Sequence, residues 1–132
     1  LIYSGTPVHI VQWYLNRDKN RVVRVRIRGE EAFLTIKGAN NGIVRTEFEY
    51  NIPYSEALAM LPLADGKVID KTRWTLDYGG HTWEVDEFHG DLSGLILAEV
   101  ELESEDEEVD LPIFVEREVS DDPRYYNSNL AQ

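Results

Sequence analysis

Polar and apolar residues alternate in short stretches along most of this chain, and the alternation predicts a protein made mainly of β-strands. The clearest case is residues 21–28 (RVVRVRIR), in which valine and isoleucine alternate with Arg24 and Arg26. A period of two residues places successive side chains on opposite faces of a strand. After a turn at Gly29 the alternation continues through residues 32–37 (AFLTIK). These two stretches therefore predict a hairpin with one apolar face and one cationic face.

Further strands are predicted where similar stretches lie between turn signals such as Asn41-Gly42 and Asp65-Gly66. They cover residues 8–15, 44–50, 68–74, 82–88 and 95–102. Helix is predicted only at residues 54–61 and in a short segment near Pro123. About seven antiparallel strands with so little helix to cover a flat sheet favour closure into a barrel. We therefore expect residues 1–132 to form one mainly β (α+β) domain.

The charge of the chain narrows the possible partners. The formal net charge is -12, from 25 acidic and 13 basic side chains, which argues against a general nucleic-acid binder. The charges are segregated, however: residues 21–28 hold four bases and no acid, whereas residues 99–110 hold eight acids and no base. A local cationic site on an acidic protein suggests a small polyanion. The sequence has no cysteine, signal peptide or membrane span, so we expect no membrane partner and take the cytoplasm as the default location.

The charged residues share one face of each predicted strand and are largely sorted by sign from strand to strand. The bases on this face are Arg24, Arg26, Lys37, Arg45, Lys71 and Arg73. The acids are Glu47, Glu49, Glu84, Asp86, Glu99 and Glu101. The face could be a solvated surface with weak ion pairs. Solvated faces usually mix the two signs, so the sorting favours an enclosed site, in which bases bind phosphate oxygens and carboxylates bind Mg²⁺ or Mn²⁺.

At this point the chain resembles a known family through an ordered set of motifs. They are VRVRIRGEEAFLTIKG (residues 23–38), RTEFE (45–49), KTRW (71–74), WEVDEF (83–88), AEVE (98–101) and EVSDDPRYYN (118–127). In this order they are similar to the motifs of the CYTH, or triphosphate tunnel metalloenzyme, superfamily, and most of all to its short bacterial inorganic triphosphatases. Each motif alone has little specificity, but the ordered set spans the chain from about residue 10 onward.

The resemblance implies a closed, eight-stranded antiparallel β-barrel tunnel with a charged interior. It also implies a hydrolase that converts inorganic triphosphate to pyrophosphate and phosphate with Mg²⁺ or Mn²⁺, with Lys71 and Arg73 as catalytic residues. The residues implied to contact phosphate are Arg24, Arg26, Lys37, Arg45, Lys71, Arg73 and Arg124. Those implied to lie at the metal are Glu99, Glu101, Asp86 and Glu84, with Glu47 and Glu49 supporting the basic residues.

The sequence departs from the family at its beginning. Family members open with a strand carrying Glu-x-Glu-x-Lys, whereas residues 1–8 read LIYSGTPV. We expect this first strand to be missing from the sequence. ATP, as the substrate of an adenylate cyclase, and thiamine triphosphate remain open as substrates, and so does a non-catalytic polyphosphate- or nucleotide-binding module. In each case we expect a small-molecule triphosphate partner, no nucleic acid or membrane, and a monomer or homodimer.

Overall fold

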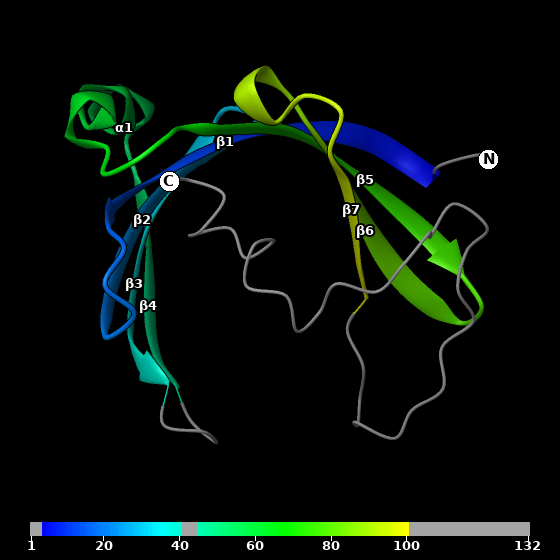
Figure 1. Cartoon of the computed structure of the whole chain (residues 1–132), viewed down its shortest axis with the longest axis horizontal. Coiled ribbons are helices and arrows are strands. Elements are labelled where there is room, and N and C mark those ends of the chain that lie inside the picture. Colours follow the sequence, from blue (N-terminus) through cyan, green and yellow to red (C-terminus); the bar gives the residue numbers. More distant parts are fainter. Residues whose placement is uncertain (1–3, 41–44, 101–132) are drawn as a thin grey trace.

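One antiparallel sheet dominates the computed structural model, which describes residues 4–40 and 45–100 (Figure 1). Its strands are β1 (Ser4–Asn16), β2 (Arg21–Arg28), β3 (Glu31–Asn40), β4 (Arg45–Ile52), β5 (Ile69–Tyr78), β6 (His81–Phe88) and β7 (Ile96–Val100). The helical elements are α1 (Tyr54–Ala59) and the 3-10 turns η1 (Leu61–Leu63) and η2 (Gly90–Leu92). The prediction of a mainly β fold with little helix is confirmed. The helix predicted near Pro123 lies outside the described residues.

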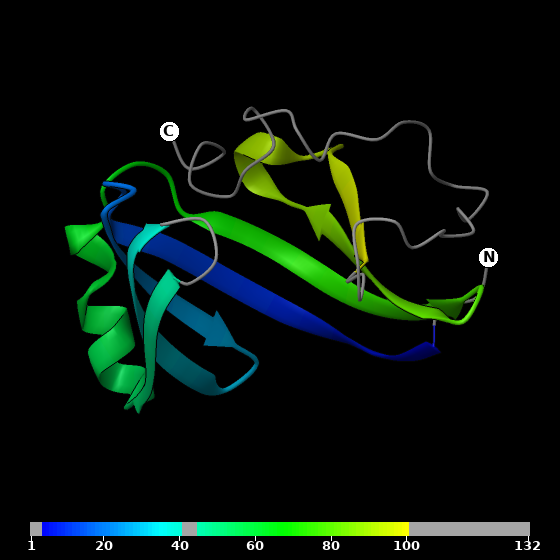
Figure 2. The same ribbon diagram turned by 90° about the horizontal axis from the view of Figure 1, so that it is seen from below.

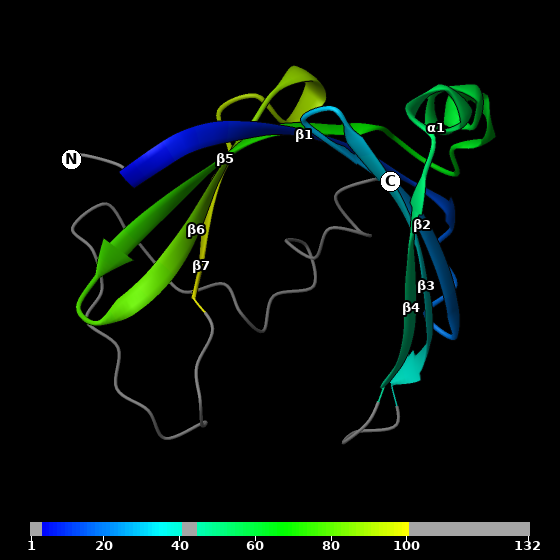
Figure 3. The ribbon, with the colours of Figure 1, turned by 180° about the vertical axis from the view of Figure 1, so that it is seen from behind.

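The strand order is β4-β3-β2-β1-β5-β6-β7, so β1 joins two meanders, one of β2–β4 and one of β5–β7. The sheet curves so that the two meanders form the sides of an arch and β1 crosses its top (Figures 1 and 3). Seen from below, β1 and β5 run across the molecule as long neighbouring strands (Figure 2). We call the inner side of the arch the concave face and the outer side the convex face.

The prediction of a closed, eight-stranded barrel is wrong. Within the described residues the sheet has seven strands, and its edges are β4 and β7, which do not pair with each other. Closure was expected because little helix was available to cover a flat sheet. Instead, the sheet bends, α1 covers part of its convex face, and leucines of η2 and the following loop cover part of its concave face. Among the described residues, no helix is long and apolar enough to cross a membrane.

The convex face packs against α1 and buries the apolar side of the β2–β3 hairpin. Trp13, Val25 and Ile27 form a core cluster there with Ala57 of α1, and Trp13, Val25 and Ala57 have no exposed surface. The indole Nε1 of Trp13 also donates a hydrogen bond of 3.2 Å to the carbonyl oxygen of Met60, just after α1. Burying an aliphatic side chain of the size of Val25 or Ile27 stabilises the fold by roughly 1.5–3 kcal/mol. This packing leaves the arginines of β2 on the concave face, as the sequence predicts.

A second apolar cluster lies on the concave face, beside the charged residues. It joins Tyr14, Val22, Ile69 and Phe88, and leucines from η2, the following loop and β7 pack against it. Alternation places Val22 on the same face as Arg24, two residues later in β2. The concave face is therefore part apolar core and part charged surface.

Candidate functional site

Strand register gathers the predicted site residues on the concave face. On the β2–β4 side, Arg24 lies opposite Thr35, and Thr35 lies opposite Glu49. On the β5–β7 side, Arg73 lies opposite Asp86, and Glu84 lies opposite Glu99. Alternation adds the other predicted residues of the described strands to this face: Arg26, Lys37, Arg45, Glu47 and Lys71. Glu101 and Arg124 lie outside the described residues.

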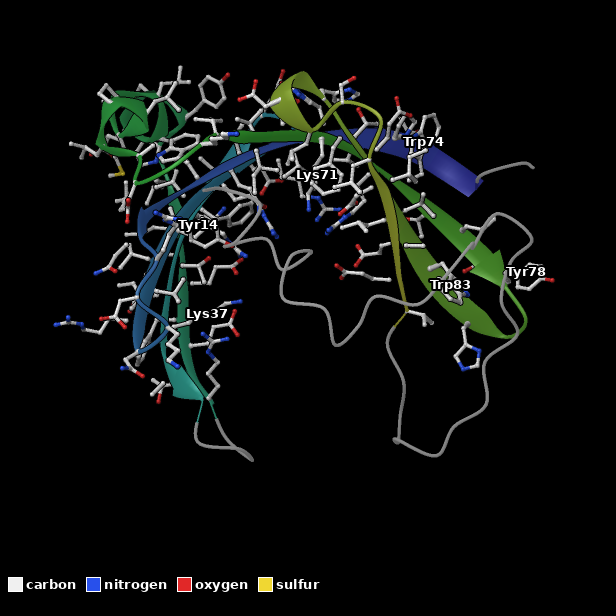
Figure 4. All side chains as sticks on the ribbon, in the orientation of Figure 1. Tyr14, Lys37, Lys71, Trp74, Tyr78 and Trp83 are labelled. Carbon is white, nitrogen blue, oxygen red and sulfur yellow. The ribbon has the colours of Figure 1, made fainter. Side chains whose placement is uncertain are left out.

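The centre of the face is a buried cluster of Lys71, Asp86 and Arg73. The ammonium of Lys71 donates to Oδ2 of Asp86 at 2.8 Å, and the Lys71 side chain has no exposed surface. Arg73 donates from Nε to Oδ1 at 2.8 Å and from Nη2 to Oδ2 at 2.9 Å. The Lys71 nitrogen also lies 5.5 Å from the centre of the Phe88 ring, at cation–π distance. Figure 4 shows Lys71 pointing into the arch.

These contacts hold Asp86 in its charged form. Burial would raise the pKa of the carboxyl group, but the hydrogen bonds from Arg73 and the charge of Lys71 outweigh burial, so the pKa lies below its ordinary value. The hydrogen bond to Asp86 likewise raises the pKa of Arg73. Both Asp86 oxygens accept hydrogen bonds from cations, so a metal ion would have to compete with three donors there.

Arg26 is held in a different way, by a neutral side chain. Its Nε donates a 2.9 Å hydrogen bond to Oε1 of Gln12, which has no exposed surface. Burial, together with the nearby charges of Arg24 and Arg73, lowers the pKa of Arg26 to about 10, so it remains a cation at neutral pH. Among the described residues, no carboxylate forms an ion pair with Arg26 or Arg24.

Weaker contacts position the other basic side chains of the β2–β4 side. Nη2 of Arg24 donates to the buried hydroxyl of Thr35 at 3.4 Å, and that hydroxyl donates to Oε2 of Glu49 at 3.4 Å. Nε of Arg45 donates to the backbone carbonyl of Gly38 at 3.1 Å. Burial and the charge of Arg24 lower the pKa of Lys37. Among the described residues of the β2–β4 side, the basic side chains of the concave face outnumber its carboxylates, Glu47 and Glu49, which favours binding of an anionic ligand.

Tyr14 brings a phenol group into the same region. It lies opposite Arg24 in the β1–β2 register and points into the arch (Figure 4). Burial raises the pKa of its hydroxyl group, although Arg24 and Arg26 oppose this effect. The hydroxyl therefore stays protonated at neutral pH and can donate a hydrogen bond to an anion.

Glu84 and Glu99 are the carboxylates best placed to bind a metal ion. They face each other across β6 and β7, and the Glu84 side chain is 47% exposed, with one oxygen 3.2 Å from Nη1 of Arg73. No group of three or more metal-binding side chains occurs within residues 4–40 and 45–100. Two carboxylates fit a Mg²⁺-like ion that takes its remaining ligands from phosphate and water. Glu84 and Glu99 therefore fit a divalent metal, whereas the paired oxygens of Asp86 fit one poorly.

Sequence reasoning missed Gln12 and Tyr14 as members of this face. Gln12 and Tyr14 come from β1, which is largely apolar on both faces, so alternation does not reveal which side chains point inward. The signal available in the sequence was Gln12 itself, a polar side chain in the middle of an apolar strand. Alternation does place Thr35, two residues before Lys37, on this face, but it does not predict that Thr35 lies between Arg24 and Glu49.

Comparison with known proteins identifies a family and relatives whose names refer to a triphosphate. Residues 2–126 match the CYTH domain. The chain is 46% identical to an inorganic triphosphatase from Acetivibrio thermocellus over 122 residues, which cover 92% of this chain and 78% of that protein. It is 36% identical to an inorganic triphosphatase from Nitrosomonas europaea over 129 residues, covering 94% and 84% of the two chains. The crystal structure of the inorganic triphosphatase NE1496 resembles this fold with a TM-score of 0.78 and 33% identity, covering 99% of this chain and 87% of that one.

Proposed function

Because the chain belongs to the CYTH domain family, we propose that it hydrolyses inorganic triphosphate to pyrophosphate and phosphate with a divalent metal. One observation carries the proposal: on the concave face, Arg24 and Arg26 lie together without a carboxylate partner among the described residues. Arg24 is buried and Arg26 is half-buried, and cations removed from water without an ion-paired carboxylate are costly unless an anion binds them. The two curated relatives, both inorganic triphosphatases, support this assignment.

In this proposal the β2–β4 side and Arg73 hold the phosphate chain. Charge-assisted hydrogen bonds from guanidinium groups suit phosphate oxygens, which carry most of the negative charge in the reaction. Lys71 is fully buried and bonded to Asp86, so we assign the direct contact at the centre to the partly exposed Arg73. The proposed phosphate contacts are Arg24, Arg26, Lys37, Arg45 and Arg73, with Arg124 kept as a prediction from the sequence.

The proposed metal ligands are Glu84 and Glu99, and Glu101 remains a prediction from the sequence. The oxygen-only character of this set suits Mg²⁺ or Mn²⁺. When bound, such an ion would neutralise charge on the phosphate oxygens. Glu47 and Glu49 lie opposite Lys37 and Thr35 on the concave face, where they balance the basic residues.

The reaction needs little covalent chemistry from the protein. The oxygen of a water molecule bonds to a terminal phosphorus, the bond from that phosphorus to the bridging oxygen breaks, and pyrophosphate leaves as a proton passes to solvent. The arginines would keep the substrate in line and stabilise the charge that gathers on the leaving oxygen. Tyr14 can donate a hydrogen bond to a phosphate oxygen without losing its proton.

Phosphate release from tripolyphosphate with Mg²⁺ or Mn²⁺ tests the proposal. Wild-type protein should release phosphate, and Arg24→Ala/Arg26→Ala should lose about 100-fold or more in kcat/KM, because each charge-assisted hydrogen bond contributes roughly 1.5–3 kcal/mol. The control is Arg21→Ala/Arg28→Ala, which removes two exposed arginines from the same strand and should keep the activity. Absence of metal-dependent release from the wild type, or full activity of the first double variant, contradicts the proposal. ATP and thiamine triphosphate in the same assay show whether the site prefers a substituted triphosphate.

A further inference from the structure

Gln12 stands out because it is a fully buried amide on the charged side of the sheet. It lies on the central strand β1, in register with Arg26 of β2 on one side and with Ile69 of β5 on the other. Its side chain has no exposed surface, so it cannot be explained as a solvated polar residue. A buried amide in a sheet normally satisfies both of its polar atoms. Within the part of the chain that the structure describes, Gln12 satisfies only one of them.

The orientation of the amide follows from its neighbour. Nε of Arg26 donates to Oε1 of Gln12 at 2.9 Å, and Nε2 of Gln12 is buried without a hydrogen-bond partner among the described residues. Rotating the amide by half a turn would place two donors against each other and leave Nε of Arg26 unpaired. The fold therefore accepts an unpaired Gln12 nitrogen in order to keep the acceptor facing Arg26.

Arg73 shows the alternative way to hold an arginine on this face. Its Nε donates to a carboxylate, that of Asp86, at 2.8 Å, and its charge is matched there. Arg26 is fixed by the same nitrogen, Nε, but its acceptor is uncharged. The amide therefore fixes the direction of the guanidinium without cancelling its charge.

We infer that Gln12 is a positioning residue for phosphate binding, which aims Arg26 at the substrate while leaving its full positive charge available. The inference rests on the proposed function, in which Arg26 contacts the triphosphate. Gln12 acts only through Arg26. Its neutrality matters as much as its hydrogen bond, so a carboxylate of the same shape should be a worse residue at this position than an apolar one.

Two substitutions separate the roles of shape and charge. Gln12→Glu keeps the shape and the acceptor but adds a negative charge beside Arg26, and should raise KM for tripolyphosphate at least tenfold with a smaller change in kcat. Gln12→Met removes the acceptor without adding charge and should raise KM by a smaller factor. Asn20→Asp, in the exposed β1–β2 turn, is the control for an added charge and should leave KM unchanged.

A double variant shows whether the effect passes through Arg26. If it does, Gln12→Met/Arg26→Met should have the same KM as Arg26→Met alone, because the amide has nothing left to position. The inference is overturned if the effects of Gln12→Met and Arg26→Met on KM multiply in the double variant. It is also overturned if Gln12→Glu leaves KM unchanged and lowers only the melting temperature. If Gln12→Glu fails to fold, Gln12→Met and the double variant still decide the question.

Binding measurements keep this test independent of turnover. The dissociation constant for tripolyphosphate, measured by calorimetry in all variants, should follow the same order as KM. If the wild-type protein binds tripolyphosphate but does not hydrolyse it, the proposed hydrolysis is contradicted. In that case the order of the dissociation constants among the variants still tests the role of Gln12. Wild-type protein that neither binds nor hydrolyses it overturns both.

Discussion

The ammonium nitrogen of Lys71 lies 2.8 Å from Oδ2 of Asp86, and at most 4% of either side chain is exposed. Removing two charges from water is expensive, so such a pair needs further hydrogen bonds, which Arg73 supplies. The pair itself is not a strong source of stability. What it provides is a fixed position for Arg73 at the centre of the concave face, where a loose guanidinium would bind phosphate less well.

Asp86→Asn should destabilise the fold markedly, because it leaves the Lys71 charge buried without a counter-charge. The expected loss in the free energy of unfolding is about 3–5 kcal/mol, as for other buried pairs that lose one partner. Urea unfolding followed by tryptophan fluorescence measures it. Asp91→Asn, at an exposed site with only a 3.9 Å contact to Lys67, is the control and should change stability by about 0.5 kcal/mol or less. A similar loss in both variants would show that burial of the pair has no special role.

The stabilising effect of Asp86 should depend on pH in the acid range. The pKa of Asp86 in the folded state lies below its ordinary value of 3.8, so the folded state binds the proton less tightly than the unfolded state. The contribution is therefore complete above 3.8 and is lost as the pH falls through the folded-state pKa. Unfolding free energies measured from about pH 6 downward should show the wild type approaching Asp86→Asn only below 3.8. A constant difference between the two proteins across this range would contradict the assignment.

Substrate affinity should weaken on the alkaline side as Lys37 loses its charge. Burial and Arg24 lower the pKa of Lys37 below its ordinary 10.5, so the uncharged amine appears at a lower pH than for a free lysine. KM for tripolyphosphate should rise as the pH passes through that pKa. Lys37→Arg keeps its charge to much higher pH and should move the rise upward. Lys67→Arg, exposed before β5, serves as the control, and an unshifted profile in Lys37→Arg would exclude Lys37 as the titrating group.

Metal dependence should be sensitive to the two facing carboxylates of β6 and β7. Glu84→Gln and Glu99→Gln should each raise the Mg²⁺ or Mn²⁺ concentration needed for half-maximal activity by about tenfold or more, because carboxylates are the preferred protein ligands of these ions. Titrating the metal at saturating tripolyphosphate measures the shift. Glu87→Gln, an exposed residue of β6 on the opposite face, is the matched control. If all three variants need the same metal concentration for half-maximal activity, the ion does not bind at Glu84 and Glu99.

Part of the fold follows from the sequence because the signals are local. The β2–β3 hairpin has strict alternation and a glycine turn, and Gly29 adopts a φ of 62°, which favours glycine. The predicted helix at residues 54–61 is shorter in the structure, where α1 ends at Ala59 and Pro62 belongs to η1. Closure of the sheet could not be predicted, since strand count does not say whether β4 and β7 meet.

The site was predictable as a face but not as a set of contacts. Alternation assigns Arg73 and Asp86 to the concave face, but only the register of the β5–β6 hairpin places them opposite each other. A residue predicted to bind metal thus bonds to two cations. Gln12 escaped notice because β1 carries no charge alternation. Sequence periodicity gives the direction of a side chain, whereas its partner depends on how the strands are aligned.

The pairing of β1 with β5 also has a consequence for how the chain becomes active. Within each meander neighbouring strands follow one another in sequence, but β1 meets β5 across a long stretch of chain, as His9 and Asp70, 61 positions apart, show. Such distant contacts form slowly. After dilution from urea, recovery of triphosphatase activity should therefore lag behind the formation of the hairpins seen by circular dichroism. Until that last step, newly made chains would carry two half-sites, a mainly basic one on β2–β4 and a mixed one on β5–β7, and neither could turn over substrate.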